Sequence, residues 1–257
     1  MSLVLDARQR AMLAEMGVRV FAPPAVAPAA AAEDAAVAPV RRPPARTEQD
    51  RVDRVVQGPP QVQEAVAARD GDVATAAGLD WDALQQAVAA FAAARRRKPV
   101  FGTGDLHARW LCIGEPPLED EEHEGLPFAG DPGRLLDNML AAVGASRRQG
   151  AYLTNVLKCR LPQDRADEAG EIAQSLAFLR RQVELLQPRV ILAMGRFAVQ
   201  ALLQTAEPTG KLRGQVHRFH GVPVVVTFPP AYLLRTPADK ARAWADLCLA
   251  RAVVEAG

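Results

Sequence analysis

Cysteine is scarce in this chain, with 3 in 257 residues. A chain of this length can bury a hydrophobic core without covalent cross-links, so the low, odd count excludes a disulfide-stabilised scaffold and favours a reducing compartment. No run of about 18 apolar residues is present, which excludes a membrane-spanning helix. The N-terminus also lacks the basic, apolar and small-residue order of a signal peptide. We therefore expect a soluble cytoplasmic protein.

An excess of charge of either sign is also missing, because 31 Lys and Arg residues face 30 Asp and Glu residues. Domains that bind nucleic acid through bulk electrostatics usually carry a clear basic excess. Any contact of this chain with DNA would therefore be local.

Aromatic residues make up only 5 % of the chain, and almost none lies between Ala22 and Gly71. This stretch is rich in Ala, Pro, Val, Gln and Arg and has no sustained period. Such a composition buries too little apolar surface to offset the ordering entropy. We predict that residues 23–79 form a disordered, proline-extended linker.

A short amphipathic segment precedes the predicted linker. Four apolar side chains recur in it at helical spacing, Leu5, Met12, Leu13 and Met16. A glycine then ends the helix, and the aromatic Phe21 follows. We predict that residues 1–22 are a helical docking peptide that folds on contact with a partner. The alternative is a helix that packs on the chain's own domain.

From residue 80 onward, apolar runs alternate with amphipathic helical patterns. The predicted strands are 108–113, 151–156, 190–194 and 222–228, and the predicted helices are 80–97, 132–143, 167–186, 196–204 and 237–254. This alternation is typical of a parallel sheet with helices on both faces. We predict one α/β domain over residues 80–257, a three-layer α/β/α fold with a central four-stranded parallel sheet and a site at the strand C-terminal ends.

Polar and aromatic side chains follow these strands. Glu115 comes directly after the first strand, and Phe128 stands at the end of the same proline-rich loop. The second strand ends at Asn155, whose amide offers two donors and one acceptor. The pattern predicts a planar ligand that stacks on Phe128 and hydrogen-bonds to Asn155. An asparagine that caps a loop backbone would give the same pattern.

Three segments, GEPPLEDEEHEGLPFAG, TNVLKCRLP and PPAYLLR, resemble in order and spacing the motifs of the uracil-DNA glycosylase superfamily. Within it they resemble the bacterial iron-sulfur group called family 4. The resemblance covers about residues 100 to 245. It implies the glycosylase fold, with a flipped uracil stacked on Phe128 and read along its edge by Asn155.

The resemblance also implies roles for the other motif residues. Glu115 and Glu121 match the carboxylates that serve the water attacking the anomeric carbon. Tyr232, Leu233 and Arg235 match the loop that enters the DNA groove. Each residue also has a plain structural interpretation, such as packing or helix capping.

The departures from the family pattern oppose full activity. The family's histidine, which donates to the departing uracil anion, aligns with Pro229, and losing one such donor costs about 3 kcal/mol. Pro116 and Leu118 replace smaller residues in the first loop, where they would obstruct a backbone needing a positive φ. The same loop carries a block of negative charge that we expect to repel DNA, at Glu119, Asp120, Glu121, Glu122 and Glu124.

The cysteines depart from the family pattern as well. Family members hold a four-iron cluster with four thiolates, of which only Cys159 is present here. The early pair falls in the cysteine-free stretch AVAAFAAARRR, and the position in the following helix aligns with Ser175. We therefore predict no cluster, no metal and no other cofactor.

A second resemblance concerns the N-terminal segment. RQRAMLAEMGVRVFAPP is similar to the N-terminus of the psi subunit of bacterial DNA polymerase III. In that family the peptide docks on the clamp loader, while the body binds the chi subunit. The resemblance implies clamp-loader and chi-like partners, with at most weak DNA contact.

Two functions follow, in different classes. The main reading is a non-catalytic, psi-like replication adaptor whose body is a pseudoenzyme. The alternative is an active or weak uracil-DNA glycosylase, so the sequence leaves the enzymatic status open.

The adaptor reading makes a direct prediction. A peptide of residues 1–22, immobilised on beads, should retain clamp-loader subunits. A version with Leu13 and Met16 changed to Ser serves as the control, because it loses the apolar face. If the unaltered peptide retains no clamp-loader subunit, the psi-like reading is wrong.

Overall fold

The structure, a computed structural model, describes residues 76–160 and 168–256. Its sheet has six strands in the order β1-β3-β2-β4-β6-β5. The central four are parallel and match the predicted strands: β3 (Ala151–Asn155), β2 (Trp110–Gly114), β4 (Val190–Met194) and β6 (Val222–Thr227). The four-strand count was too low, because two antiparallel strands flank these four, β1 (Thr103–Gly104) and β5 (Val216–Phe219).

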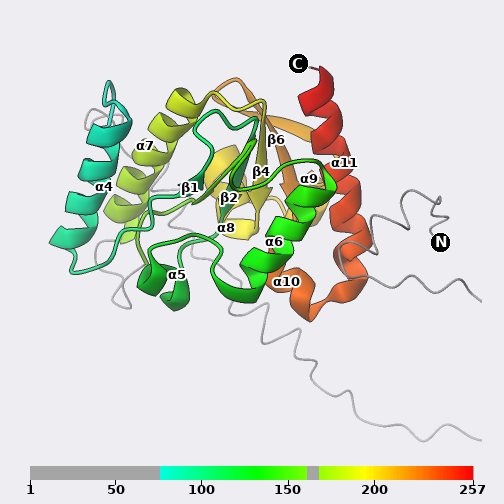
Figure 1. Cartoon of the computed structure of the whole chain (residues 1–257), viewed down its shortest axis with the longest axis horizontal. Coiled ribbons are helices and arrows are strands. Elements are labelled where there is room, and N and C mark those ends of the chain that lie inside the picture. Colours follow the sequence, from blue (N-terminus) through cyan, green and yellow to red (C-terminus); the bar gives the residue numbers. More distant parts are fainter. Residues whose placement is uncertain (1–75, 161–167, 257) are drawn as a thin grey trace, which may run out of the picture.

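Helices cover both faces of this sheet (Figure 1). The five predicted helices correspond to α4 (Trp81–Ala94), α6 (Gly130–Ala142), α7 (Glu168–Leu186), α8 (Arg196–Leu203) and α11 (Lys240–Ala256). The sequence prediction omitted three short helices, α5 (Glu119–Glu124), α9 (Thr209–Leu212) and α10 (Pro230–Arg235). The first residues of the predicted helix 237–254 form a separate 3-10 helix, η3 (Pro237–Asp239). The three-layer α/β/α architecture is confirmed.

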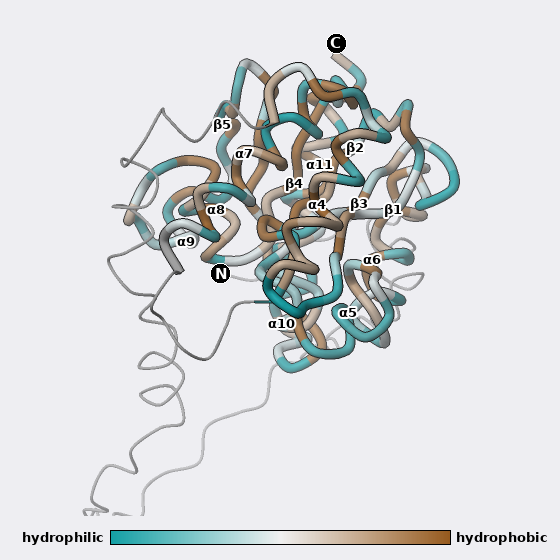
Figure 2. Tube along the Cα trace, turned by 90° about the vertical axis from the view of Figure 1, so that its left-hand side faces the viewer, coloured by the Kyte–Doolittle hydropathy of each residue, from teal (hydrophilic) through white to brown (hydrophobic). Residues whose placement is uncertain are grey.

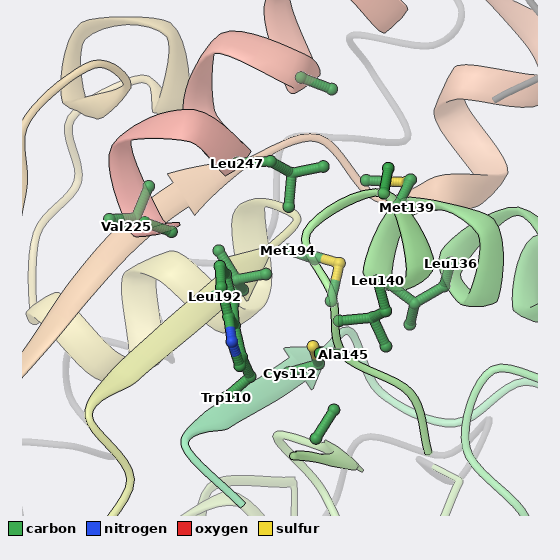
Figure 3. Packing of buried hydrophobic residues seen from close by; sticks show 14 of the residues in the cluster. Trp110, Cys112, Leu136, Met139, Leu140, Ala145, Leu192, Met194, Val225 and Leu247 are labelled. Carbon is green, nitrogen blue, oxygen red and sulfur yellow. The ribbon is translucent and has the colours of Figure 1, made fainter. Parts of the chain in front are cut away.

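Two hydrophobic cores lie on opposite faces of the sheet. Trp110, Cys112 and Leu192 face α6 and α11, and Figure 3 shows their packing against Met139 and Leu247. The alternate residues of the same strands pack instead with α7 and α8. Because both faces are covered, β2, β3 and β4 are buried along their whole length, which explains their continuous apolar sequences.

A third, smaller core joins α4 to α7. It contains Leu84, Val88 and Phe91 of α4 together with Phe178 of α7. Ala76 belongs to it and is 2 % exposed. The folded body therefore includes residues 76–79, which the sequence reading assigned to the linker.

The parallel register brings the strand C-terminal ends to one edge of the sheet. Gly114 pairs with Asn155, and Met194 pairs with Thr227. Figure 2 shows α5 and α10, which follow β2 and β6, gathered at this same end of the molecule. The three loops singled out in the sequence therefore meet there.

The predicted docking peptide, residues 1–22, and most of the predicted linker lie outside the described residues. Among the residues that the structure describes, no helix combines the length and apolarity needed to cross a membrane.

Candidate functional site

Glu115 is the first residue after β2, at the start of the first loop. Its carboxylate accepts a hydrogen bond of 2.9 Å from the backbone N–H of Phe197, in the first turn of α8. Gly195, with φ of 100°, leaves room for it, because a Cβ there would lie 2.2 Å from Glu115 Oε1. Burial raises the pKa of Glu115, while the Phe197 N–H and the charge of Arg196 act against this shift.

Glu121 of α5 joins the first loop to β3. Its carboxylate accepts from the backbone N–H of Leu118 at 2.8 Å and of Phe128 at 2.5 Å. It also accepts from Asn155 Nδ2 at 3.3 Å. Glu121, which accepts these hydrogen bonds, is only 8 % exposed. Glu121 therefore holds the first loop against β3, and its predicted role toward a water molecule stays a prediction.

Phe128 has a left-handed backbone, with φ of 55°. Its ring packs on Gly114, where a Cβ would lie 2.6 Å from the ring. Arg147 donates to its carbonyl oxygen at 3.1 Å and to that of Pro127 at 3.2 Å. Nothing in the sequence pattern singled out Arg147, because it lies in a loop far from the three motifs.

Asn155 presents one unused polar atom. Its Nδ2 donates to the carbonyl oxygen of Glu115 at 2.8 Å and to Glu121. Its Oδ1 is buried and has no hydrogen-bond partner among the residues that the structure describes. Such orphaned acceptors are rare in protein interiors, and they mark a site or a strained position. The amide orientation follows from the two acceptors that Nδ2 faces.

Lys158 is fully buried behind Asn155. Its Nζ contacts three acceptors, Gln182 Oε1 at 2.6 Å, Thr154 Oγ1 at 2.7 Å and the Asn155 carbonyl oxygen at 2.9 Å. Burial lowers the pKa of Lys158 well below its usual value. Three acceptors match the three donors of an ammonium group. This network fixes the end of β3.

The last loop differs in part from the sequence prediction. Leu233 does not face solvent, because its side chain is 0 % exposed and packs in the core. The exposed apolar side chain is Leu234, at 42 %, and Arg235 beside it is exposed as expected. In the six-residue helix α10, successive side chains point about 100° apart around the axis, so Leu234 is exposed although Leu233 is buried.

Tyr232 belongs to a stacked arrangement at the base of the same loop. Its ring stacks on Phe228 with centroids 5.1 Å apart, and its hydroxyl donates to Asp239 at 2.6 Å. The guanidinium of Arg213 lies 3.9 Å from the centroid of the Phe228 ring and is paired with the buried Asp246. Pro229 stands between these groups as the N-cap of α10.

The acidic run of the first loop is largely used within the molecule. Glu121 is buried, and Glu122 lies 3.9 Å from both Arg97 and Arg160. Glu119 lies 3.4 Å from Arg160. The run therefore presents less free negative charge than its sequence indicates. Leu118 has an ordinary extended backbone, with φ of −86°, so its replacement of a smaller residue causes no strain.

The residues near Cys159 do not fit a four-thiolate cluster. Cys159 is buried in the α4–α7 core, whereas Cys112 and Cys248 lie on β2 and α11. Position 175 is close to it, because the Ser175 hydroxyl accepts from the N–H of Lys158 at 3.5 Å. Within the described ranges, no group of three His, Cys, Asp or Glu residues is placed to hold a metal ion.

A family model described as the uracil DNA glycosylase superfamily matches residues 101–248. The chain belongs to the uracil-DNA glycosylase superfamily. It is 35 % identical over 162 residues to a type-4 uracil-DNA glycosylase of Pyrobaculum aerophilum, a match covering 60 % of this chain and 82 % of that protein. It is 37 % identical over 149 residues to the type-4 enzyme of Thermotoga maritima, covering 57 % and 77 %.

More distant relatives belong to other groups. A type-5 uracil-DNA glycosylase of Pyrobaculum aerophilum is 29 % identical over 152 residues, covering 53 % of this chain and 67 % of that protein. A DNA polymerase of Bacillus phage SP01 is 27 % identical over 140 residues, covering 54 % of this chain and 15 % of the polymerase.

This superfamily chain thus brings four of its predicted site residues together. Glu115, Glu121, Phe128 and Asn155 are linked by hydrogen bonds at one end of the sheet. The loop with Tyr232 and Arg235 lies at the same end (Figure 2), while Leu233 is turned into the core.

The raised pKa of Glu115 predicts a pH-dependent gain in stability for Glu115→Gln. A carboxyl with a raised folded-state pKa stabilises the fold below its unfolded pKa, and this contribution disappears as pH rises through the folded value. Glutamine keeps the acceptor for Phe197 without a buried charge. The thermal midpoint of Glu115→Gln should therefore exceed that of the wild type at pH 7, and the gain should vanish below about pH 4.

Glu207→Gln is the matched control, because this residue is exposed. It should show no such difference between the two pH values. An equal shift of the Glu115→Gln midpoint at both pH values would contradict burial as the cause.

Proposed function

We propose that this chain is a slow uracil-DNA glycosylase that hydrolyses the N-glycosidic bond of uracil in DNA. The observation that carries the proposal is the orphaned, buried Oδ1 of Asn155. It lies among the motif residues Glu115, Glu121 and Phe128, in the part of the chain that matches the superfamily.

The free atom of Asn155 is an acceptor, which selects the base. Both contacts of Nδ2 are made within the protein, to Glu115 and Glu121, so Oδ1 is the atom left for a ligand. Uracil offers an N–H donor at N3, whereas cytosine offers an unprotonated acceptor there. An acceptor facing an acceptor leaves two buried groups unpaired, which costs about 1–3 kcal/mol for each. The site therefore favours uracil over cytosine.

Base entry requires a local movement. Oδ1 is covered, and Phe128 is only 9 % exposed. A base can bond to Asn155 only after the atoms covering Oδ1 move aside. Phe128 then supplies an apolar ring for stacking, as base-flipping enzymes require.

Glu115 is the residue best placed to act on water. Unlike the carboxylate of Glu121, which three donors occupy, its carboxylate has one backbone donor, Phe197 N–H. Burial raises its pKa, and a higher pKa makes a carboxylate a better proton acceptor from an attacking water. Its carbonyl oxygen also holds Asn155, which couples the water-activating group to the base-reading group.

Pro229 explains why the rate should be low. It has no side-chain donor for the negative charge that develops on the departing uracil, and one missing donor lowers the rate roughly 100-fold or more. The internal pairing of Glu119 and Glu122 supports DNA approach, because these carboxylates face arginines of the same molecule.

The adaptor reading receives no support from the comparisons. The matched relatives named above are glycosylases and one phage DNA polymerase. The match concerns residues 101–248 and not the docking peptide. Clamp-loader and chi-like partners therefore stay a prediction for residues 1–22.

The central test is uracil excision by the purified full-length chain, on a single-stranded oligonucleotide and on a U:G duplex. The product is the abasic strand, measured after alkaline cleavage. Asn155→Ala should lower kcat/KM about 10- to 100-fold, the value of one or two buried hydrogen bonds to the base.

Asn138→Ala is the matched control, because this asparagine is exposed on α6. It should leave excision unchanged. If the wild-type chain releases no uracil above the rate of the Asn155→Ala variant on either substrate, the proposed function is wrong.

A gain-of-function variant tests the role of Pro229. Pro229→His should raise kcat about 100-fold, because it adds a donor to the leaving group. The substitution removes no backbone hydrogen bond, since Pro229 only accepts, from the N–H groups of Tyr232 and Leu233. Pro229→Ala, which adds no donor, should leave the rate near that of the wild type. Equal rates for the His and Ala variants would refute this explanation of slow excision.

A further inference from the structure

Helix α4 covers the place where the family resemblance puts an iron-sulfur cluster. Phe91 of α4 meets Phe178 of α7 edge to face, with ring centroids 5.5 Å apart. Both rings belong to the same buried core as Cys159. Ser175, at the aligned ligand position, bonds to the backbone of the residue next to Cys159. The one surviving cysteine therefore packs within an apolar core, with charged side chains such as Arg95 and Glu171 nearby.

An ion pair closes this contact at the surface. Arg95, at the end of α4, donates to Glu171 of α7 at 2.8 Å, and the two side chains are 24 % and 10 % exposed. The guanidinium also lies 3.8 Å from the centroid of the Phe91 ring. A partly buried pair with a stacked guanidinium is held more firmly than an exposed one. This contact fastens α4 to α7.

Among the described residues, Cys159 is the one cysteine of the α4–α7 core. Burial there raises the pKa of its thiol to about 11. Cys112 and Cys248 are associated with a different core cluster.

Lys158 connects the α4–α7 contact to Asn155. This residue is next to Cys159 in the chain, and its Nζ donates to the carbonyl oxygen of Asn155 at 2.9 Å. Its own carbonyl oxygen accepts from Val100 at 2.8 Å. A displacement of Cys159 would therefore be transmitted to the end of β3.

We propose that a packed clamp replaces the iron-sulfur cluster and holds residues 156–160, and through Lys158 the base-reading Asn155, in place without metal. The clamp consists of Phe91, Arg95, Cys159, Glu171 and Phe178. It does not depend on whether the chain excises uracil, because its evidence is the contact between α4, α7 and the segment after β3.

Amide hydrogen exchange in the full-length chain tests the clamp. Phe91→Ala should speed exchange of the amides of residues 156–160 at least about tenfold, since it opens the core behind them. The matched control is Phe219→Ala, which removes the same atoms from β5, against the second core. It should leave these amides within about twofold of the wild type. Phe91→Leu keeps the apolar bulk and should restore slow exchange.

Equal acceleration of residues 156–160 by Phe91→Ala and Phe219→Ala would overturn the proposal. If Phe91→Ala does not fold, Arg95→Met and Glu171→Gln remove the ion pair while keeping side-chain size. Each should speed exchange of the same amides about threefold. In the double variant Arg95→Glu with Glu171→Arg, the amides of residues 156–160 should exchange more slowly than in either single reversal. If exchange of these amides is unchanged in all of these variants, the clamp is refuted.

Iron analysis separates the clamp from a hidden cluster. The chain purified without oxygen should contain no iron above background, and EDTA or ferricyanide should leave its thermal midpoint unchanged. Cys159→Ala should stay folded, with a midpoint lowered by no more than about 4 °C. About four irons per chain, with a midpoint that falls on chelation, would show that a cluster is present and the clamp is not a replacement.

Discussion

The carboxylate of Glu121 accepts hydrogen bonds from the backbone of Leu118, the backbone of Phe128 and the side chain of Asn155. A buried carboxylate is unfavourable unless such donors satisfy it, so the three segments are constrained together. This single group sets the curvature of the first loop, the place of the stacking ring and the orientation of the amide. Removing it would leave Phe128 N–H and one Asn155 donor without a partner. The geometry of the candidate site therefore depends on the hydrogen bonds of this one carboxylate.

Other charged side chains of the folded body are also paired with one another. The basic segment 95–98, which follows α4, contacts the acidic helix α5, and both Arg97 and Arg160 lie 3.9 Å from Glu122. Part of the opposite charge in the described body is thus paired within the molecule. The net charge of the chain therefore says little about its affinity for DNA. A local contact with DNA would be made by side chains that are exposed at the site end of the sheet, such as Leu234 and Arg235.

The four central strands could be predicted because they are short apolar runs, and the five longer helices because apolar residues recur along longer segments between them. The edge strands β1 and β5 and the short helix α5 could not, since two to six residues carry no period and tertiary contacts decide their conformation. At the site, motif order located Glu115, Phe128 and Asn155. It did not reveal the three donors around Glu121, because which donors surround a carboxylate depends on long-range contacts. Leu233 was misplaced because its helical turn, only six residues long, was not foreseen.

Phe128 adopts a left-handed backbone that disfavours bulky side chains, at a cost of about 1–2 kcal/mol. Two hydrogen bonds formed on folding offset this cost, because the Phe128 N–H donates to Glu121 and its carbonyl oxygen accepts from Arg147. The backbone that carries the ring is consequently held in place before any ligand arrives. Ordering a free side chain on association costs about 0.5–1.5 kcal/mol, and a planar base that stacks here is spared that loss. Part of the affinity for such a base is thus determined by backbone conformation, independently of any contact that the base makes.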